Sequence, residues 1–199
     1  MNFEELVIRN RSYRRFDESK RLDRKTLVDL VNVARRTPSA GNLQPLRYAL
    51  VLDPDACARM FAHLKWAGAL KDWDGPAEGE RPVAYVIVLN DTQVSRDPGC
   101  DHGIACQSML LAAAERGLGG CMLGAIDRDG IRGGFRVDDR YEILLVVALG
   151  VPAEQCVLED APPGGDITYY RDAQGVHHVP KRPLQDVIVE AQVGPAKSR

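Results

Sequence analysis

Apolar residues recur at helical intervals near the start of the chain. In residues 3–7 they are three and four positions apart, which predicts a short helix. Residues 27–34 carry one apolar stripe at helical spacing, and Asp23, which precedes them, is a residue type that favours helix N-caps. Together they predict a second helix. Because the residue before a proline is disfavoured in a helix, this helix should end before Pro38. The pattern therefore predicts two helices ahead of the first strand.

Two apolar runs further along the chain have the length of strands. Residues 83–89 and 143–149 are continuous runs of strand-forming residues, which is typical of strands buried on both faces. Shorter strands are expected at 48–52 and 121–123, with helices at 55–64, 97–116 and 127–133. Strands and helices in this order predict an α+β or α/β fold with a sheet flanked by helices.

The segment 65–82 interrupts this order of elements. It contains both tryptophans, Trp66 and Trp73, together with three glycines, two prolines and many charges. Because it is longer than most connections, we interpret it as a mobile cover with one or two helical turns. The alternative is that both tryptophans pack at an interface between subunits.

After Gly150 the chain becomes rich in proline and charge. Residues 166–171 are expected to extend along a sheet edge, and the apolar residues of this tail have no evident core to enter. Such a tail suggests a partner subunit. We therefore expect one domain over residues 1–199, with 65–82 as an insert and 151–199 as a C-terminal extension that wraps a partner.

Composition narrows the range of partners. The chain has 199 residues, enough for one substantial core, and a net charge of −2. Its basic residues are spread along the sequence, so no nucleic-acid surface is expected. The N-terminus lacks a signal-peptide pattern, and no apolar run has the length of a membrane span. We expect a cytoplasmic protein that binds no membrane.

Two further patterns carry no cofactor signature. The glycines of residues 117–120 follow a predicted helix and lack the dinucleotide-binding spacing, so we interpret them as a helix stop. The five cysteines form no CxxC pair, which argues against a disulfide framework and against a zinc site. We expect most of them to be small buried apolar side chains, and we expect no metal.

Two short segments combine residue types that suit a phosphorylated ring compound. Residues 11–16 read Arg-Ser-Tyr-Arg-Arg-Phe, and guanidinium groups bind phosphate and polarised ring oxygens. Residues 38–45 read Pro-Ser-Ala-Gly-Asn-Leu-Gln-Pro, and each amide side chain offers a heterocycle both donors and an acceptor. Taken alone, the first segment could be a solvated face and the second an ordinary loop. Together they predict a site for a phosphorylated cofactor with a ring system.

These segments resemble those of the FMN-dependent nitroreductase family. The resemblance covers almost the whole chain and includes the long helix around 101–115, Leu-Gly-Ala at 123–125 and the basic Pro-Lys-Arg-Pro-Leu at 180–184. It implies an α+β fold with a central, mostly antiparallel sheet flanked by helices. It also implies a homodimer in which the C-terminal tails are exchanged and two FMN molecules lie at the interface.

The resemblance assigns roles to individual residues. Arg11 and Ser12 would hold the flavin phosphate, joined by Lys181 or Arg182. Arg14 would face the ring and stabilise the reduced flavin. The remaining cofactor contacts would come from the second segment, on the other subunit, and from the stretch lining the ring: Pro38, Ser39, Ala40, Asn42, Gln44, Leu123, Gly124 and Ala125. Trp66 and Trp73 would border the substrate.

The implied reaction is a ping-pong reduction. NADH or NADPH would reduce the flavin and leave, and a nitroaromatic or quinone-type small molecule would then accept the electrons in the same place. No catalytic side chain is required beyond the tuning by Arg14. The alternatives are a flavin-binding protein without NAD(P)H turnover, a specialised flavin enzyme of the same fold (a dehalogenase or a flavin-fragmenting enzyme), and a structural dimerisation domain.

Overall fold

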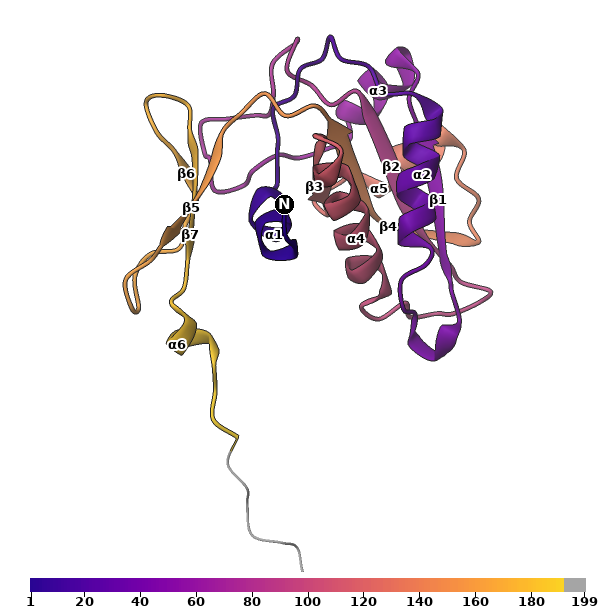
Figure 1. Cartoon of the computed structure of the whole chain (residues 1–199). Helices are drawn as coiled ribbons and strands as arrows, with labels where there is room; N and C mark the ends of the chain where they lie inside the picture. Colours follow the sequence, from indigo (N-terminus) through magenta and orange to yellow (C-terminus); the bar gives the residue numbers. More distant parts are fainter. Residues whose placement is uncertain (192–199) are drawn as a thin grey trace, which may run out of the picture. The chain divides into compact units, whose positions relative to one another are not determined.

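The computed structural model describes residues 1–191, and the chain divides into two compact units. Unit 1 spans Met1–Gln155, and unit 2 begins at Cys156 (Figure 1). This boundary falls close to residue 151, where the sequence predicts the start of an extension. The end of that extension, residues 192–199, lies outside the described residues. A single domain over residues 1–199 and an extension that wraps a partner stay predictions.

Unit 1 is built on a four-stranded sheet. Its strands are β1 (Leu46–Val51), β2 (Ala84–Asp91), β3 (Gly119–Leu123) and β4 (Tyr141–Gly150), in the order β1-β2-β4-β3. Every neighbouring pair is antiparallel. The prediction of an α+β fold with a mostly antiparallel central sheet is therefore confirmed, and β1 and β3 are the two edges of this sheet.

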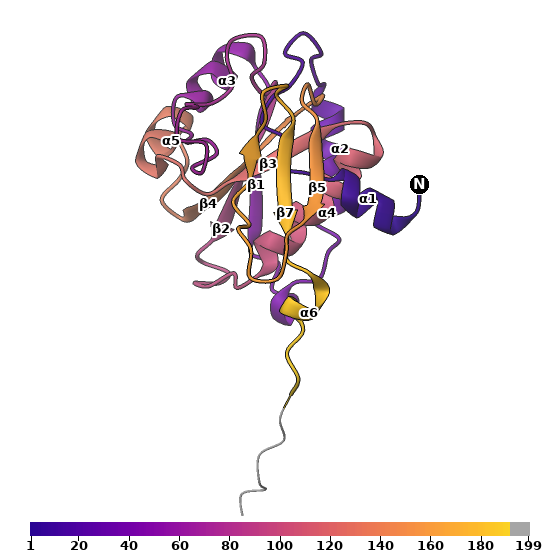
Figure 2. The same cartoon turned by 90° about the vertical axis from the view of Figure 1, so that its left-hand side faces the viewer.

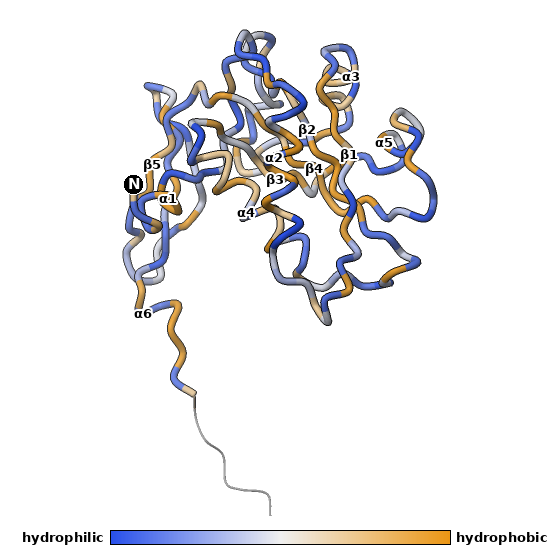
Figure 3. Tube along the Cα trace, turned by 45° about the vertical axis from the view of Figure 1, so that its right-hand side comes forward, coloured by the Kyte–Doolittle hydropathy of each residue, from blue (hydrophilic) through white to orange (hydrophobic). Residues whose placement is uncertain are grey.

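Helices cover both faces of the sheet. On one face lie α2 (Arg24–Ala34) and α4 (Asp101–Glu115), on the other α3 (Pro54–Phe61) and α5 (Arg128–Phe135), while α1 (Phe3–Arg9) contacts α4 (Figure 1). Successive side chains of a strand point to opposite faces, so Val86 and Val88 enter one core and Tyr85 and Ile87 enter the other. All of β2 is buried, and Figure 3 shows hydrophobic residues along it. The apolar run at 83–89 is confirmed as a strand buried on both faces.

Local side chains decide where the helices begin and end. The Asp23 carboxylate accepts from Thr26 N at 2.7 Å, and the Asp127 carboxylate accepts from Gly130 N at 3.0 Å, as the sequence predicts. Gly117 ends α4 with φ +75°, a conformation that favours glycine. The helix predicted at 97–116 begins only at Asp101, because the Asp97 carboxylate accepts from Gly99 N at 2.8 Å and forms a turn there.

The described residues bear on two expectations from composition, one about the cysteines and one about membrane-spanning helices. Three of the five cysteines are buried, one is partly buried, and only Cys100 is exposed, so the expectation that most are buried is confirmed. Burial raises the pKa of Cys57 to about 11 and that of Cys106 to about 12, which keeps both thiols neutral. Within residues 1–191, no helix is both long and apolar enough to cross a membrane.

The segment 65–82 differs from its prediction. It consists of turns and irregular backbone without a helix, so the predicted helical turns are wrong. Trp66 is only 6% exposed and packs against Phe61, with ring centroids 5.7 Å apart. Gly75, at φ +125°, passes so close that a Cβ there would lie 2.6 Å from the Trp66 ring. Packing around a core tryptophan therefore organises this segment, and Trp73 is partly buried against the same core.

Unit 2 contains a small three-stranded sheet followed by a short helix. Its strands are β5 (Cys156–Asp160), β6 (Tyr170–Arg171) and β7 (His177–Lys181), and the helix is α6 (Leu184–Val187). β7 lies in the middle, parallel to β5 and antiparallel to β6, and Figure 2 shows β5 and β7 side by side. Of the extended stretch predicted at 166–171, only the last two residues pair as a strand.

A histidine joins all three strands of this small sheet. His178 on β7 contacts Glu159 on β5 and accepts or donates a hydrogen bond at 3.0 Å with Asp172, beside β6. Its ring stacks on Tyr170 at a centroid distance of 4.6 Å. The Asp172 and Glu159 carboxylates raise the pKa of His178 above its ordinary 6.5, and the His178 ring lowers the pKa of Asp172.

These shifts predict how the stability of unit 2 depends on pH. The His178 contribution is fully present below pH 6.5 and is lost as the pH rises through the raised pKa of the folded state. The Asp172 contribution is present above its ordinary 3.8 and is lost in stronger acid. We expect the amides of β7 to exchange faster with solvent deuterium, relative to their intrinsic rates, at pH 8 than at pH 6. H178Q should remove this difference, and a difference that persists in H178Q would contradict the assignment.

Candidate functional site

The segment 11–16 lies along the edge strand β3. Ser12 forms a parallel bridge with Gly120, and Tyr13 N donates to Gly120 O at 3.0 Å. A Cβ at Gly120 would lie 2.5 Å from Ala148 O, so only glycine lets β3 approach β4 in this way. Burial raises the pKa of the Cys121 thiol beside Ser12, so this thiol stays neutral and offers no nucleophile.

The arginines of this segment have different partners. Arg11 donates to Asn10 O at 2.6 Å and to Val7 O at 2.7 Å, which caps the C-terminal end of α1. Arg15 forms a two-pronged ion pair with Glu80 from the 65–82 segment. Arg14 Nη1 donates to Ser12 O at 3.2 Å. The three guanidinium groups that look alike in the sequence therefore have separate roles in the fold.

Glu154 holds the backbone of the same segment. Its carboxylate accepts hydrogen bonds from both Arg14 N and Arg15 N, the latter at 3.1 Å. This anchor lies far away in the sequence, just after β4, and no local pattern singles it out. The position of Arg14 thus depends on a residue that the sequence analysis missed.

Residues 123–125, which the sequence predicts to line the cofactor ring, lie at the other end of β3. Leu123 ends the strand and is buried, whereas Gly124 and Ala125 are exposed. A Cβ at Gly124 would meet nothing within 4 Å, so the backbone there is open to approach. From Gly120, which pairs with Ser12, to Gly124 the chain advances about 13 Å if it stays extended. Lys65 N donates to Ala125 O at 3.0 Å, which ties the start of the 65–82 segment to this stretch.

The second motif forms a tight loop at the opposite edge of the sheet. It contains a short 3₁₀ turn (Ala40–Asn42) and leads into β1. Gly41, Asn42 and Gln44 all have positive φ, at +56°, +53° and +52°. Two of these three are not glycine, so the loop holds a conformation that side chains disfavour.

Hydrogen bonds inside the loop use several of its predicted ligand groups. Ser39 Oγ donates to Asp101 Oδ2 at 2.5 Å and accepts from Gln44 N at 2.9 Å. Ala40 N donates to Asp101 Oδ1 at 3.0 Å. Gln44 Nε2 donates to Asn42 Oδ1 at 3.1 Å, so the two amide side chains contact each other.

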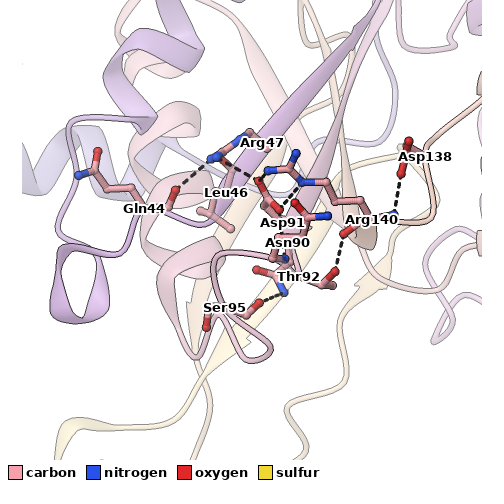
Figure 4. Close-up of polar contacts among 10 residues, drawn as sticks. Gln44, Leu46, Arg47, Asn90, Asp91, Thr92, Ser95, Asp138 and Arg140 are labelled. Atoms are coloured by element: carbon pink, nitrogen blue, oxygen red, sulfur yellow. Dashed lines mark hydrogen bonds and ion pairs between the residues drawn. The ribbon is translucent and has the colours of Figure 1, made fainter.

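A second carboxylate holds the end of the loop (Figure 4). Arg47 donates to Gln44 O at 3.0 Å and pairs with Asp91 at 3.1 Å. Arg140 binds both oxygens of Asp91, at 2.7 and 2.6 Å. Asp91 is fully buried, and the hydrogen bonds of Arg140 hold the pKa of its carboxyl below the usual range, so it stays ionised.

A cavity of about 170 Å³ lies against this loop. Its walls include Thr37, Pro38, Ser39, Gln44, Tyr48 and Asp101. Burial raises the pKa of Tyr48 to about 12, so its hydroxyl remains a neutral hydrogen-bonding group at physiological pH. The cavity thus combines polar groups with the apolar ring of a proline.

The predicted site residues fall into separate groups in one chain. Ser12 and Arg14 lie beside β3, and the 38–44 loop precedes β1, at the opposite edge of the same sheet. Lys181 ends β7 in unit 2, and Arg182 follows it, both exposed. Trp66 and Trp73 belong to the core packed against α3 and α5. Unit 1 therefore carries two groups of predicted site residues, which we term half-sites, one at each edge of its sheet.

Comparisons with known proteins agree with the fold and the motifs. The family described as the nitroreductase family matches residues 8–151. The chain belongs to the nitroreductase family. The matched range contains both half-sites of this nitroreductase-family chain, and Lys181 and Arg182 lie after it.

Individual relatives of this family member are distant. A protein of Archaeoglobus fulgidus, provisionally named NADH dehydrogenase/NAD(P)H nitroreductase, is 23% identical over 75% of this chain and 85% of its own length. The structure of a nitroreductase family protein from Streptococcus pneumoniae has a TM-score of 0.68 at 17% identity and covers 96% of this chain and all of its own. A provisionally named nitroreductase from Exiguobacterium sibiricum, solved in complex with FMN, has a TM-score of 0.65 at 17% identity, covering 77% and 90%.

Proposed function

We propose that this protein is an FMN-dependent oxidoreductase. It oxidises NADH or NADPH and then, in a ping-pong order, reduces a nitroaromatic or quinone-type acceptor. Membership of the nitroreductase family supports an oxidoreductase activity. The FMN in the Exiguobacterium sibiricum structure and the NAD(P)H in the name of the Archaeoglobus fulgidus relative support the cofactor and the electron donor.

The residues along β3 fit an elongated phosphorylated flavin. Ser12 and Arg14 lie near one end of the strand, and the open backbone of Gly124 lies past the other end. We assign the phosphate to Ser12, with Arg11 and Lys181 or Arg182 as further cationic groups. Arg14 and the backbone of residues 123–125 are assigned to the ring. The observation that carries this assignment is the Ser12–Gly120 bridge, because it holds the exposed Ser12 beside the edge strand β3.

FMN, when bound, supplies the hydride chemistry, and the chain positions and tunes it. Arg14 would place a positive charge beside the flavin ring, where negative charge develops on reduction. This charge would stabilise the reduced flavin. The backbone of Gly124 offers hydrogen-bonding groups without a side chain to block approach, whereas the carbonyl of Ala125 already accepts from Lys65 N. Trp73, which is partly buried, borders the acceptor through the 65–82 segment, whose start is tied to Ala125, whereas Trp66 lies in the core.

The separation of the half-sites supports a homodimer. Because β1 and β3 are opposite edges of one sheet, the 38–44 loop and the Ser12 segment do not meet within unit 1. A second copy of the chain can bring the loop of one subunit to the β3 edge of the other. We therefore assign Pro38, Ala40, Asn42 and Gln44 as contacts made from the partner subunit, and the C-terminal extension as part of the same interface.

A visible absorption spectrum tests the proposal first. The purified protein is incubated with FMN, desalted and examined, and NADPH or NADH is then added without oxygen, while light scattering gives the mass in solution. We expect retained flavin that bleaches with either donor, in a dimer. Retained flavin that stays oxidised would instead favour a flavin-binding protein without NAD(P)H turnover. A folded dimer that retains no flavin would contradict the proposal.

A further inference from the structure

A single buried carboxylate organises the loop that carries the second motif. Asp101, at the first turn of α4, is 3% exposed. Its two oxygens accept from two consecutive residues of the loop, Ser39 Oγ and Ala40 N. Both partners are donors, so the contact requires two acceptors, which a carboxylate supplies and an amide does not. The negative charge also lies at the N-terminal end of a long helix, where the helix dipole stabilises it.

The serine hydroxyl is occupied by this arrangement. A hydroxyl has one proton to donate, and that of Ser39 goes to Asp101 at 2.5 Å. The same oxygen accepts from Gln44 N at 2.9 Å, across the loop. Asp101 therefore fixes Ser39, and Ser39 in turn fixes the backbone at Gln44.

This clamp acts on a strained stretch of backbone. Between its two ends the chain takes positive φ at Gly41, and again at Asn42 and Gln44, where side chains make that conformation costly. A strained conformation persists only where the surrounding contacts impose it. Arg47, paired with Asp91, holds the carbonyl of Gln44 as well, so the loop is fixed from both sides.

We infer that Asp101 is the positioning residue of the flavin site, and that Ser39 serves the Asp101 contact rather than the cofactor. This inference rests on the proposed function insofar as the loop contacts FMN from the partner subunit. Asp101 acts through the backbone of residues 39–44 and presents the Asn42 and Gln44 amides in one orientation. Without Asp101, the Asn42 and Gln44 amides sample several orientations. Flavin binding must then order them, and this ordering lowers the affinity for FMN.

The test compares D101N, S39A and the double variant, with D97N as the matched control. Asp97 is an exposed aspartate just before the same helix, and its carboxylate accepts from Gly99 N within its own turn. FMN dissociation constants are measured by flavin fluorescence at two temperatures where each variant is folded, together with the visible circular dichroism of the bound flavin. We expect D101N and S39A each to weaken FMN binding about ten-fold and to alter the flavin dichroism. The double variant should be no weaker than the weaker single variant, and D97N should match wild type.

Several results would overturn the inference. Tight FMN binding by D101N would do so, and so would additive effects in the double variant, because additivity would mean that Ser39 contacts the flavin directly. If D101N does not fold, S39A is the deciding variant. Unchanged FMN affinity, together with unchanged protection of the Gln44 amide from hydrogen exchange, would exclude the clamp.

Amide exchange without flavin separates this inference from the proposed function. In the apoprotein, the Ala40 and Gln44 amides should be protected in wild type and D97N, and both should lose protection in D101N. This result would support the clamp even if wild type retained no FMN, a case in which only the proposed function would fail. Unchanged protection in a folded D101N would overturn the clamp.

Discussion

Replacing Gly120 by alanine is expected to destabilise unit 1 by about 1–3 kcal/mol and to weaken flavin retention. The added Cβ would lie 2.5 Å from Ala148 O and 2.6 Å from Leu110 Cδ2. Ala148 belongs to β4, which is paired on both sides, so β4 cannot move without breaking two ladders. The edge strand β3 must shift instead, and the bridge from Gly120 carries that shift to Ser12.

The matched control is the same substitution at an open position. Gly103 lies on the exposed side of α4, and a Cβ there would meet nothing within 4 Å. G103A should therefore stabilise the protein by about 0.5–1 kcal/mol, because alanine is the better helix former. Urea unfolding of both variants gives the free energies. A G120A protein as stable as wild type would show that β3 accommodates a side chain there, against the close approach to β4.

Replacing Arg14 by alanine is expected to weaken FMN binding about 10- to 100-fold, which is the loss of one charge-assisted hydrogen bond. The flavin potential should also become more negative, because the positive charge favours the anionic reduced flavin. For two electrons, about 1.4 kcal/mol of lost stabilisation corresponds to about 30 mV. The measurements are an FMN titration and a spectroelectrochemical titration of the bound flavin.

Two companion variants sharpen this result. R14K keeps the charge and loses the planar fork, so it should retain most of the potential and lose part of the affinity. R24A removes an exposed arginine of α2 and should change neither quantity.

Mixing R14A with N42A subunits should also restore part of the flavin binding, since mixed dimers contain one intact site. Unchanged occupancy and potential in R14A would remove Arg14 from the flavin site.

The structure also changes the interpretation of residues that the motifs group together. In the sequence, Arg11, Arg14 and Arg15 form one cluster of guanidinium groups suited to phosphate and polarised ring oxygens, yet Arg15 pairs with Glu80 and Arg11 caps α1. Their partners come from a different segment and from the preceding helix. Arg14 instead donates to the carbonyl of Ser12, the residue that bridges β3.

Local physics made much of the fold predictable. The apolar runs at 83–89 and 143–149 predict central strands because a strand covered on both faces consists mostly of apolar side chains. Asp23 and Asp127 predict the starts of helices because their carboxylates accept hydrogen bonds from free backbone N–H groups three residues further on. Each of these signals depends on neighbours in the chain, and each is confirmed.

The remaining features depend on residues that are distant in sequence. In the sequence Trp66 belongs to a segment predicted as a mobile cover, and in the structure it is a core residue because Phe61 and Gly75 pack around it. Asp101 has no motif of its own, and it acquires a role only when α4 is packed beside the 38–44 loop. Hydrogen bonds and side-chain packing act over a few ångströms, so only the folded chain decides which distant groups come within that range.

The sequence by itself determined the order of strands and helices, the helix caps and the two motifs, which follow from periodicity and short spacings. Its resemblance to a flavin-binding family implied the α+β fold. Only the tertiary structure decided that the two motifs lie at opposite edges of one sheet, and that Asp101, Glu154 and Asp91 hold them in place. Strand order is set by the pairing of segments far apart in the chain, and no local pattern specifies that pairing.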